Sequence, residues 1–229
     1  MDLPYPAGLY RTLGRGVSPP APGADTCRVL PTHAIGGIDD NYEPCDAVEA
    51  YDPRLRRVDS AGEPARGSLP HHTAAVVDGK IYVVGGIIYD DEGEEVATGL
   101  VEMYDPAADS WQQMAAMPTV RYSHASAVMD GKIYVSGGFT TLGELSDAFE
   151  AYDPVTNTWA TLASLSEVRA DHASAAFDGK LYVFGGWASG GDRRDLVEVY
   201  GPASNSWARA ADLPDPPSLR HRRAGRGRG

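Results

Sequence analysis

The sequence predicts an all-β fold assembled from one repeated four-stranded unit, and three observations lead to this prediction. The segments DGKIYVVGG, DGKIYVSGG and DGKLYVFGG begin at Asp78, Asp130 and Asp178. Each is followed by a Glu-x-Tyr segment and then by a tryptophan, and successive tryptophans are 48 residues apart. A period of this length is typical of repeat architectures, in which neighbouring units bury each other's apolar faces. The 229-residue chain is therefore expected to form one array of repeats.

Short runs separated by turn residues predict the strands of each unit. Residues 124–162 contain HASAVM, KIYVSGG, AFEAYDP and TWATLA, which alternate or are short and apolar, as is typical of strands. Asp-Gly lies between the first and second runs, where a tight hairpin requires a positive φ. Asp-Pro and Asn157 turn the third run into the fourth. Each unit is therefore predicted to be a four-stranded antiparallel sheet.

The same landmarks divide the chain into one degenerate and three clear copies, which span residues 23–70, 71–118, 119–166 and 167–214. The first copy is degenerate because Val58 occupies the tryptophan position and no Asp-Gly-Lys precedes its glycines. We interpret the recurring residues as a structural signature. It comprises the glycine doublets Gly36, Gly37, Gly85, Gly86, Gly137, Gly138, Gly185 and Gly186, the tyrosines Tyr51, Tyr104, Tyr152 and Tyr200, and the tryptophans Trp111, Trp159 and Trp207.

The segments outside the four copies carry separate predictions. YRTL at Tyr10 is similar to WATL at Trp159, so residues 1–22 are predicted to include the outer strand of a preceding unit. Residues 215–229 are rich in arginine and glycine, cannot bury apolar area, and are predicted to be disordered. The array is thus expected to be interrupted at both ends, which would leave strand edges and an apolar face open to self-association.

Charge excludes two classes of partner for the folded part. The chain has a formal net charge of −12 although residues 218–229 contribute five arginines and no acid. The remaining residues are therefore more acidic than the whole and should repel phosphate backbones and anionic membranes. No nucleic acid and no membrane are expected as partners.

The chain shows neither a signal-peptide-like apolar stretch nor 18 consecutive apolar residues, so a cytoplasmic protein is expected. Cys27 and Cys45 are too few for a disulfide framework or a four-cysteine zinc site. The sequence therefore predicts no cofactor and no metal.

The glycine doublet, the Tyr-Asp-Pro, the spaced tryptophan and the period together resemble kelch repeats over residues 29–214. The resemblance implies a kelch-type β-propeller whose first strands line the centre. Small residues in the first runs, such as Ala125, Ser126 and Ala127, suit that narrow position. Kelch propellers usually close with more blades than the four or so found here. The resemblance therefore implies an incomplete ring or one completed by a partner.

In kelch adaptor proteins, the loops that lead into the first strand and those after the glycine doublet share one face and hold partner peptides. Carried over by position, this implies a non-catalytic protein-interaction module. Four inserted residues in the loop of copy 71–118 carry an acidic run, which suggests a basic partner segment, with calcium as a weaker alternative. The candidate contact residues are His71, Asp91, Glu92, Arg121, Tyr122, Ser123, Arg169, Asp171 and Trp187.

Other interpretations stay open at this point. His72, His124 and His172 recur once per copy, which favours a structural role over a three-ligand zinc site. The glutamate of each Glu-x-Tyr could pair with Arg121 or Arg169 as a structural ion pair. Some kelch propellers are enzymes, such as copper-radical oxidases and sugar-acid isomerases, but no catalytic residue is predicted here. A truncated fragment without a function of its own is a further alternative.

Overall fold

The computed structural model describes residues 71–190 and 193–214 in full, together with the backbone of four short strands before residue 71. These early strands form one antiparallel sheet in the order β1-β2-β3-β4. They are β1 (Leu13–Gly14), β2 (Thr32–Ile35), β3 (Val48–Asp52) and β4 (Arg57–Ala61). The predictions for Cys27, Cys45, Gly36, Gly37, the Tyr51 side chain and residues 215–229 lie outside the described residues.

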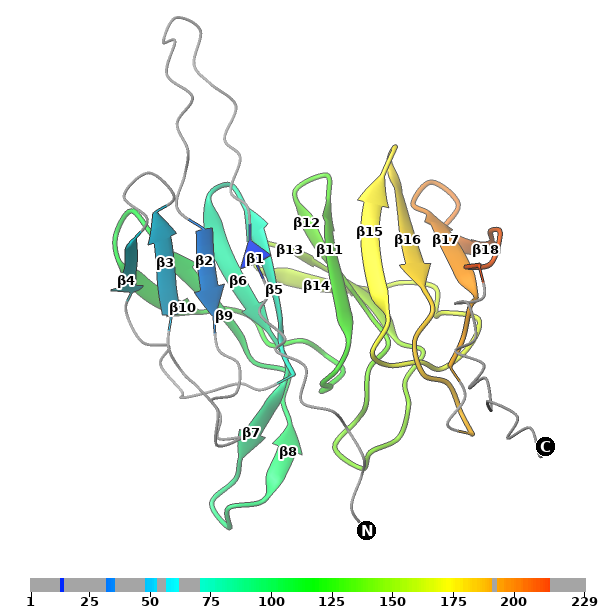
Figure 1. Ribbon diagram of the computed structural model, residues 1–229, viewed down its shortest axis with the longest axis horizontal. Helices are drawn as coiled ribbons and strands as arrows, with labels where there is room; N and C mark the ends of the chain where they lie inside the picture. The colour runs from blue at the N-terminus through cyan, green and yellow to red at the C-terminus, as the bar shows by residue number, and fades with distance from the viewer. Residues whose placement is uncertain are drawn as a thin grey trace, which may run out of the picture.

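Three four-stranded antiparallel sheets follow, one for each clear copy, and the all-β prediction is confirmed (Figure 1). The second blade contains β5 (Thr73–Val77), β6 (Lys80–Val84), β9 (Val101–Asp105) and β10 (Ser110–Gln113). The third blade contains β11 (Ala125–Met129), β12 (Lys132–Ser136), β13 (Phe149–Asp153) and β14 (Thr158–Thr161). The fourth blade contains β15 (Ala173–Phe177), β16 (Lys180–Phe184), β17 (Val197–Gly201) and β18 (Ser206–Arg209).

The N-terminal sheet corrects one prediction. β1 pairs with β2 through Leu13 and Ala34, so residues 13–14 are the first strand of this sheet. The expectation that YRTL belongs to the outer strand of a preceding unit is therefore wrong for Leu13. Strand identity depends on a pairing partner, and the similarity of four residues to WATL did not reveal that partner.

The Asp-Gly hairpins form as predicted, with both central residues at positive φ. Asp130 has φ 52° and Gly131 has φ 72°, which is the pattern of a type I′ turn. This turn fixes the register, so that Met129 pairs with Lys132 and Ala127 with Tyr134.

The turns that join the third and fourth strands of a blade are built differently. The hydroxyl of Tyr152 donates to Oδ1 of Asn157 at 2.7 Å, and Asn157 itself has φ 53°.

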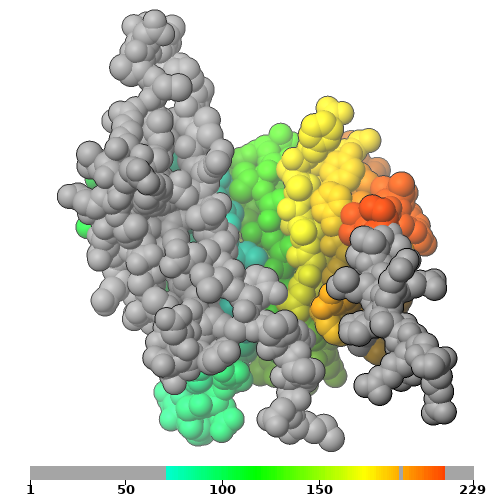
Figure 2. Space-filling model, in the orientation of Figure 1, coloured from blue at the N-terminus to red at the C-terminus, as the bar shows by residue number. Residues whose placement is uncertain are grey.

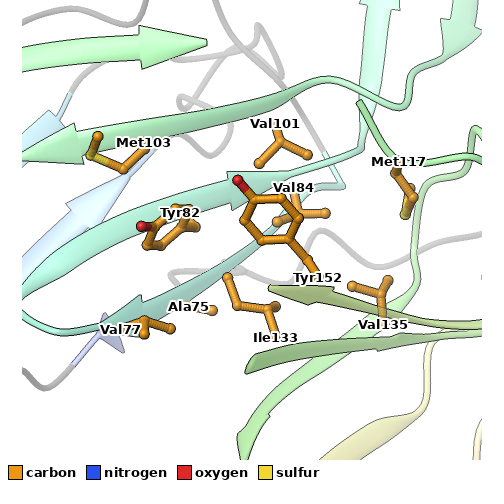
Figure 3. Close-up of a cluster of buried hydrophobic side chains, with 10 residues drawn as sticks. All are labelled: Ala75, Val77, Tyr82, Val84, Val101, Met103, Met117, Ile133, Val135 and Tyr152. Carbon is orange, nitrogen blue, oxygen red and sulfur yellow. The ribbon is translucent and has the colours of Figure 1, made fainter. Parts of the chain in front are cut away.

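Neighbouring blades pack through apolar side chains of the middle strands. Figure 3 shows the cluster between the second and third blades, where Tyr82, Val84 and Met103 face Ile133 and Tyr152. A matching cluster joins the third and fourth blades. The first strands β5, β11 and β15 lie side by side, as expected for the strands nearest the centre (Figure 1).

The outer strands are tied to the preceding blade by paired hydrogen bonds. Nε1–H of Trp159 donates to the carbonyl of Ala115 at 2.9 Å, and the N–H of Ala115 donates to Oδ1 of Asn157 at 2.8 Å. Trp207 and Asn205 make the same contacts with Ala163. The recurring tryptophan and asparagine therefore join blades.

Among the described residues, no helix has the length and apolar character needed to cross a membrane.

Candidate interaction site on the loop face

Two sets of loops meet at one end of the blades, which we call the loop face. The loop leading into β11 pairs with the loop after β12, because Tyr122 and Phe139 exchange backbone hydrogen bonds of 3.0 and 2.8 Å. Ala170 and Trp187 repeat this pairing in the fourth blade. The two loop types therefore lie side by side, as the resemblance implied.

A row of backbone hydrogen bonds connects the leading loops of three blades. The N–H of Ser123 donates to the carbonyl of His71, and the N–H of Asp171 donates to the carbonyl of Ser123, both at 3.0 Å. All three residues have positive φ values, of 60°, 50° and 51°. The side chains of His71 and Asp171 are exposed at the surface, and Nδ1 of His71 lies 3.3 Å from Oγ of Ser123. Three of the predicted contact residues are thus brought together.

An apolar groove of about 450 Å³ lies between the loops of the third and fourth blades. Its main lining side chains are Phe139, Leu145, Val168 and Trp187, with the carboxylate-bearing Glu144 among them. Tyr122 stacks on Phe139 with ring centroids 5.4 Å apart, and the Arg193 guanidinium lies 5.4 Å from the Trp187 ring centroid. The lining is completed by the small residues Gly143, Ala188, Ser189 and Gly190.

The inserted acidic loop forms a hairpin that projects from the same face. β7 (Ile87–Tyr89) pairs with β8 (Glu95–Ala97), and Figure 1 shows this hairpin extending beyond the sheets. Oδ1 of Asp90 accepts the N–H groups of Glu92 and Glu94 at 3.0 and 2.9 Å, which shapes the tip. Asp91 and Glu92 themselves are exposed, as their prediction as contact residues requires.

Arg121 and Arg169 require a correction, because neither side chain is exposed at all. Nη2 of Arg121 lies 2.5 Å from Oε2 of Glu150, and Arg169 pairs with Glu198 in the same way. Nη1 of Arg121 also donates to the carbonyls of Ala148 and Gly137 at 2.6 and 3.2 Å. These arginines close the loop end of their own blades and cannot contact a partner. The hypothesis that they form structural ion pairs is confirmed.

Burial removes both charges of each ion pair from water. Desolvation lowers the pKa of Arg121 to about 10, although the nearby Glu150 carboxylate works in the opposite direction. The guanidinium therefore keeps its charge at neutral pH. A buried pair of this kind contributes little when intact but is costly to break, because a single buried charge remains.

Two of the recurring histidines, His124 and His172, lie at blade interfaces. Nε2 of His172 lies 2.8 Å from Oγ of Ser136, and Nε2 of His124 lies 3.1 Å from Oγ1 of Thr73. Burial and the neighbouring arginine lower the pKa of His172 to about 3, and burial lowers that of His124 well below its ordinary value. Both rings are therefore neutral. Within residues 71–190 and 193–214, no three histidine, cysteine, aspartate or glutamate side chains converge on a metal position.

Comparison with known proteins assigns the family. Residues 71–225 match the family model described as the KLHDC2/KLHL20/DRC7 Kelch-repeats domain. The chain belongs to the kelch-repeat family. Its blades, glycine doublets and spaced tryptophans are thus those of a kelch propeller, and the resemblance predicted from the repeat is confirmed.

Several curated kelch proteins are similar over part of their length. Kelch-like protein terF of Aspergillus terreus is 46% identical over 77 residues, which cover 33% of this chain and 17% of that protein. Beta-scruin of Limulus polyphemus is 36% identical over 125 residues, covering 51% of this chain and 13% of that protein. The F-box/kelch-repeat protein At1g67480 of Arabidopsis thaliana is 34% identical, covering 49% and 28%. The kelch chain thus spans only a small part of these relatives.

A solved structure titled "Structure of YjhT" resembles the fold. The TM-score is 0.73 at 19% sequence identity, and the match covers 93% of this kelch chain and 69% of that chain. At this identity the likeness supports the propeller-type fold alone.

The kelch loop face also contains residues that the sequence prediction missed. Phe139, Leu145 and Val168 line the groove, and Leu142 in the same loop is 83% exposed. Only Phe139 carried a signal, because it follows a glycine doublet at the position of Trp187. The other side chains come from loops of irregular length, where the repeat gives no register.

Proposed function

We propose that this kelch domain is a non-catalytic protein-binding module whose loop face captures a peptide segment of a partner. The observation that carries the proposal is the groove lined by Phe139, Leu145, Val168 and Trp187. Concave apolar sites with aromatic walls are the usual anchoring points for a partner side chain. The kelch domains of the family are commonly protein-binding, which supports the same class of function.

The acidic hairpin favours a partner segment that carries positive charge. Asp91 and Glu92 are exposed at a tip that already contains Asp90, Glu94 and Glu95. Opposite charges across an interface accelerate encounter and set orientation. We therefore expect the captured segment to combine an apolar anchor with basic residues.

The recurring ionisable groups support a binding role over catalysis. Arg121, Glu150, Arg169 and Glu198 are used within blades, and His124 and His172 are used between them. Each of these groups thus has a packing function that explains its recurrence.

A selection of displayed random peptides on the full chain tests the proposal. We expect enriched peptides to contain an aromatic or large aliphatic residue near lysine or arginine, and Trp187→Ala to weaken their binding by about tenfold or more. Val155→Ala is the matched control, because Val155 is an 88% exposed apolar side chain in the β13–β14 turn. Equal affinity of the Trp187→Ala variant would contradict the groove as the binding site.

The charge preference is tested separately. Reversal at Asp91 and Glu92 should reduce the association rate of a basic peptide and weaken its salt dependence. Asp212→Lys is the control, because it removes an exposed carboxylate that pairs with Arg209 in an exposed ion pair. An unchanged association rate in the hairpin variant would remove the acidic hairpin from the site.

A further inference from the structure

The groove on the loop face contains one charged side chain among its described lining residues, that of Glu144. Glu144 is exposed, and none of the ion pairs or hydrogen bonds of residues 71–190 and 193–214 uses its carboxylate. Glu167, on the loop that carries Val168, is instead paired with Arg194 at 3.1 Å. A carboxylate without a counter-charge beside an apolar wall favours a cation in whatever occupies the groove.

Backbone hydrogen bonds hold Glu144 at the edge of the groove. The N–H of Thr140 donates to the carbonyl of Glu144, and the N–H of Gly143 donates to the carbonyl of Thr140, both at 2.9 Å. The next residue, Leu145, forms a backbone bridge with Phe139, and both of these side chains line the groove. The carboxylate therefore extends from a defined backbone position next to the apolar wall.

Trp187 offers a ring on which a guanidinium already packs. The Arg193 guanidinium lies 5.4 Å from the centroid of this ring. Trp187 lines the groove and Arg193 does not, so the indole keeps surface for an occupant of the groove. A guanidinium is planar, delocalised and weakly hydrated, and it therefore packs on aromatic rings and pairs with carboxylates better than an ammonium does. The wall and the carboxylate together favour arginine over lysine.

The size of the groove allows an arginine to bind beside an apolar side chain. Its volume of about 450 Å³ is within the range of roughly 300–1,000 Å³ that is typical of ligand sites. The long apolar stem of an arginine can pack along Phe139 and Leu145 while its head reaches a carboxylate at the edge. The remaining wall, from Val168 to Trp187, is then available to the apolar anchor.

The acids of the β7–β8 hairpin are separate from this carboxylate. In Figure 2 the blue-green hairpin projects at the lower left, whereas the yellow and orange fourth blade lies to the right. The hairpin acids therefore attract positive charge over a distance. Glu144 is part of the groove lining itself, so it can select one particular side chain.

We propose that the groove selects a partner segment in which an arginine lies next to the apolar anchor. The guanidinium of that arginine pairs with Glu144 and packs on the wall formed by Phe139 and Trp187. Glu144 is then the residue that determines this specificity. The arginine site rests on the protein-binding function proposed above.

Selection of displayed random peptides, run in parallel on the full chain and on its Glu144→Gln variant, tests the arginine site. The unmodified chain should enrich peptides that carry arginine, rather than lysine, next to an aromatic or large aliphatic residue. The Glu144→Gln variant should keep the apolar residue and lose the arginine, because the substitution removes only the charge. Asp147→Asn is the matched control and should keep both, since Asp147 is an exposed acid of the same loop outside the described lining.

The arginine site and the protein-binding function fail in different ways in this selection. The absence of enriched peptides, or peptides without an apolar residue in common, would overturn both. Peptides that keep the apolar residue without a preference for arginine would overturn the arginine site alone. The same preference for arginine in the Glu144→Gln variant would also overturn the arginine site alone.

The affinity of one enriched peptide measures the contact directly. Replacement of its arginine by citrulline, which has a similar shape and no charge, should weaken binding to the unmodified chain by about tenfold and binding to the Glu144→Gln variant by about twofold or less. The loss should lie mainly in the dissociation rate, because a close charge pair acts after encounter. Unchanged affinity after replacement of the arginine by lysine would overturn the assignment to a guanidinium.

Discussion

The third and fourth blades have nearly the same backbone and clearly different surroundings. Their first strands read ASAVM and ASAAF and their second strands KIYVS and KLYVF, with the same register of pairing. Yet β11 is mostly buried or half-buried, and most of β15 is exposed. The comparison teaches that the repeat determines strand pairing within a blade, whereas burial depends on the neighbouring blade.

The buried ion pairs of the third and fourth blades should contribute equally to stability, because neither pair depends on a neighbouring blade. Arg121 and Arg169 pair with glutamates of their own blades and are equally buried. We expect Arg121→Ala and Arg169→Ala each to lower the free energy of unfolding by about 3–5 kcal/mol, because each leaves a buried carboxylate unpaired. Urea denaturation measures both. A much smaller effect at Arg169 would mean that the fourth blade is not packed as the third blade is.

Substitutions on the apolar faces should affect stability differently in the third and fourth blades. Met129→Ala removes a buried side chain and should cost about 2–4 kcal/mol of stability. Phe177→Ala alters the equivalent exposed side chain and should change stability by less than about 0.5 kcal/mol. The same urea experiment compares them. Equal costs would break the comparison, since they would indicate that Phe177 is covered in solution.

Acid should weaken the contact between the blades. The folded-state pKa of His172 is about 3, below its ordinary value of 6.5, so the unfolded chain takes up a proton first as the pH falls. The stabilisation is present above about pH 6.5 and is lost progressively toward pH 3, at about 1.4 kcal/mol per pH unit. Unfolding curves from pH 7 to pH 4 measure this slope.

His172→Gln provides the control for that slope. The variant removes one titrating group at this interface, so its stability should depend less steeply on pH than that of the unmodified chain. Retention of the full slope would assign the acid sensitivity to other groups, of which His124 is the first to consider because its pKa is also lowered by burial.

The sequence predicted those features that repeat at a fixed spacing. Asp130-Gly131 specified a hairpin because a type I′ turn needs two residues tolerant of positive φ. The pairing of arginine with glutamate was also foreseen, but its location was not. Position in the kelch adaptor loops predicts Arg121 as a surface contact, whereas its side chain turns inward to the carbonyls of Gly137 and Ala148.

The groove could not be predicted because its parts do not repeat. Phe139 and Leu145 come from one blade and Val168 and Trp187 from the next copy. Their proximity depends on the packing of two sheets and on loops of unequal length. Only a three-dimensional arrangement brings them together, and periodicity carries no information about it.

The row of His71, Ser123 and Asp171 has a consequence for how recognition can be altered. His71 and Ser123 are joined by a backbone bond and by a 3.3 Å contact between Nδ1 of His71 and Oγ of Ser123, whereas the bond between Asp171 and Ser123 uses backbone atoms. The Asp171 joint therefore requires a residue that tolerates a positive φ. Asn or His can replace Asp171 without loss of the backbone bond to Ser123, because both tolerate a positive φ. The exposed position 171 therefore allows binding specificity to be changed while the scaffold stays intact.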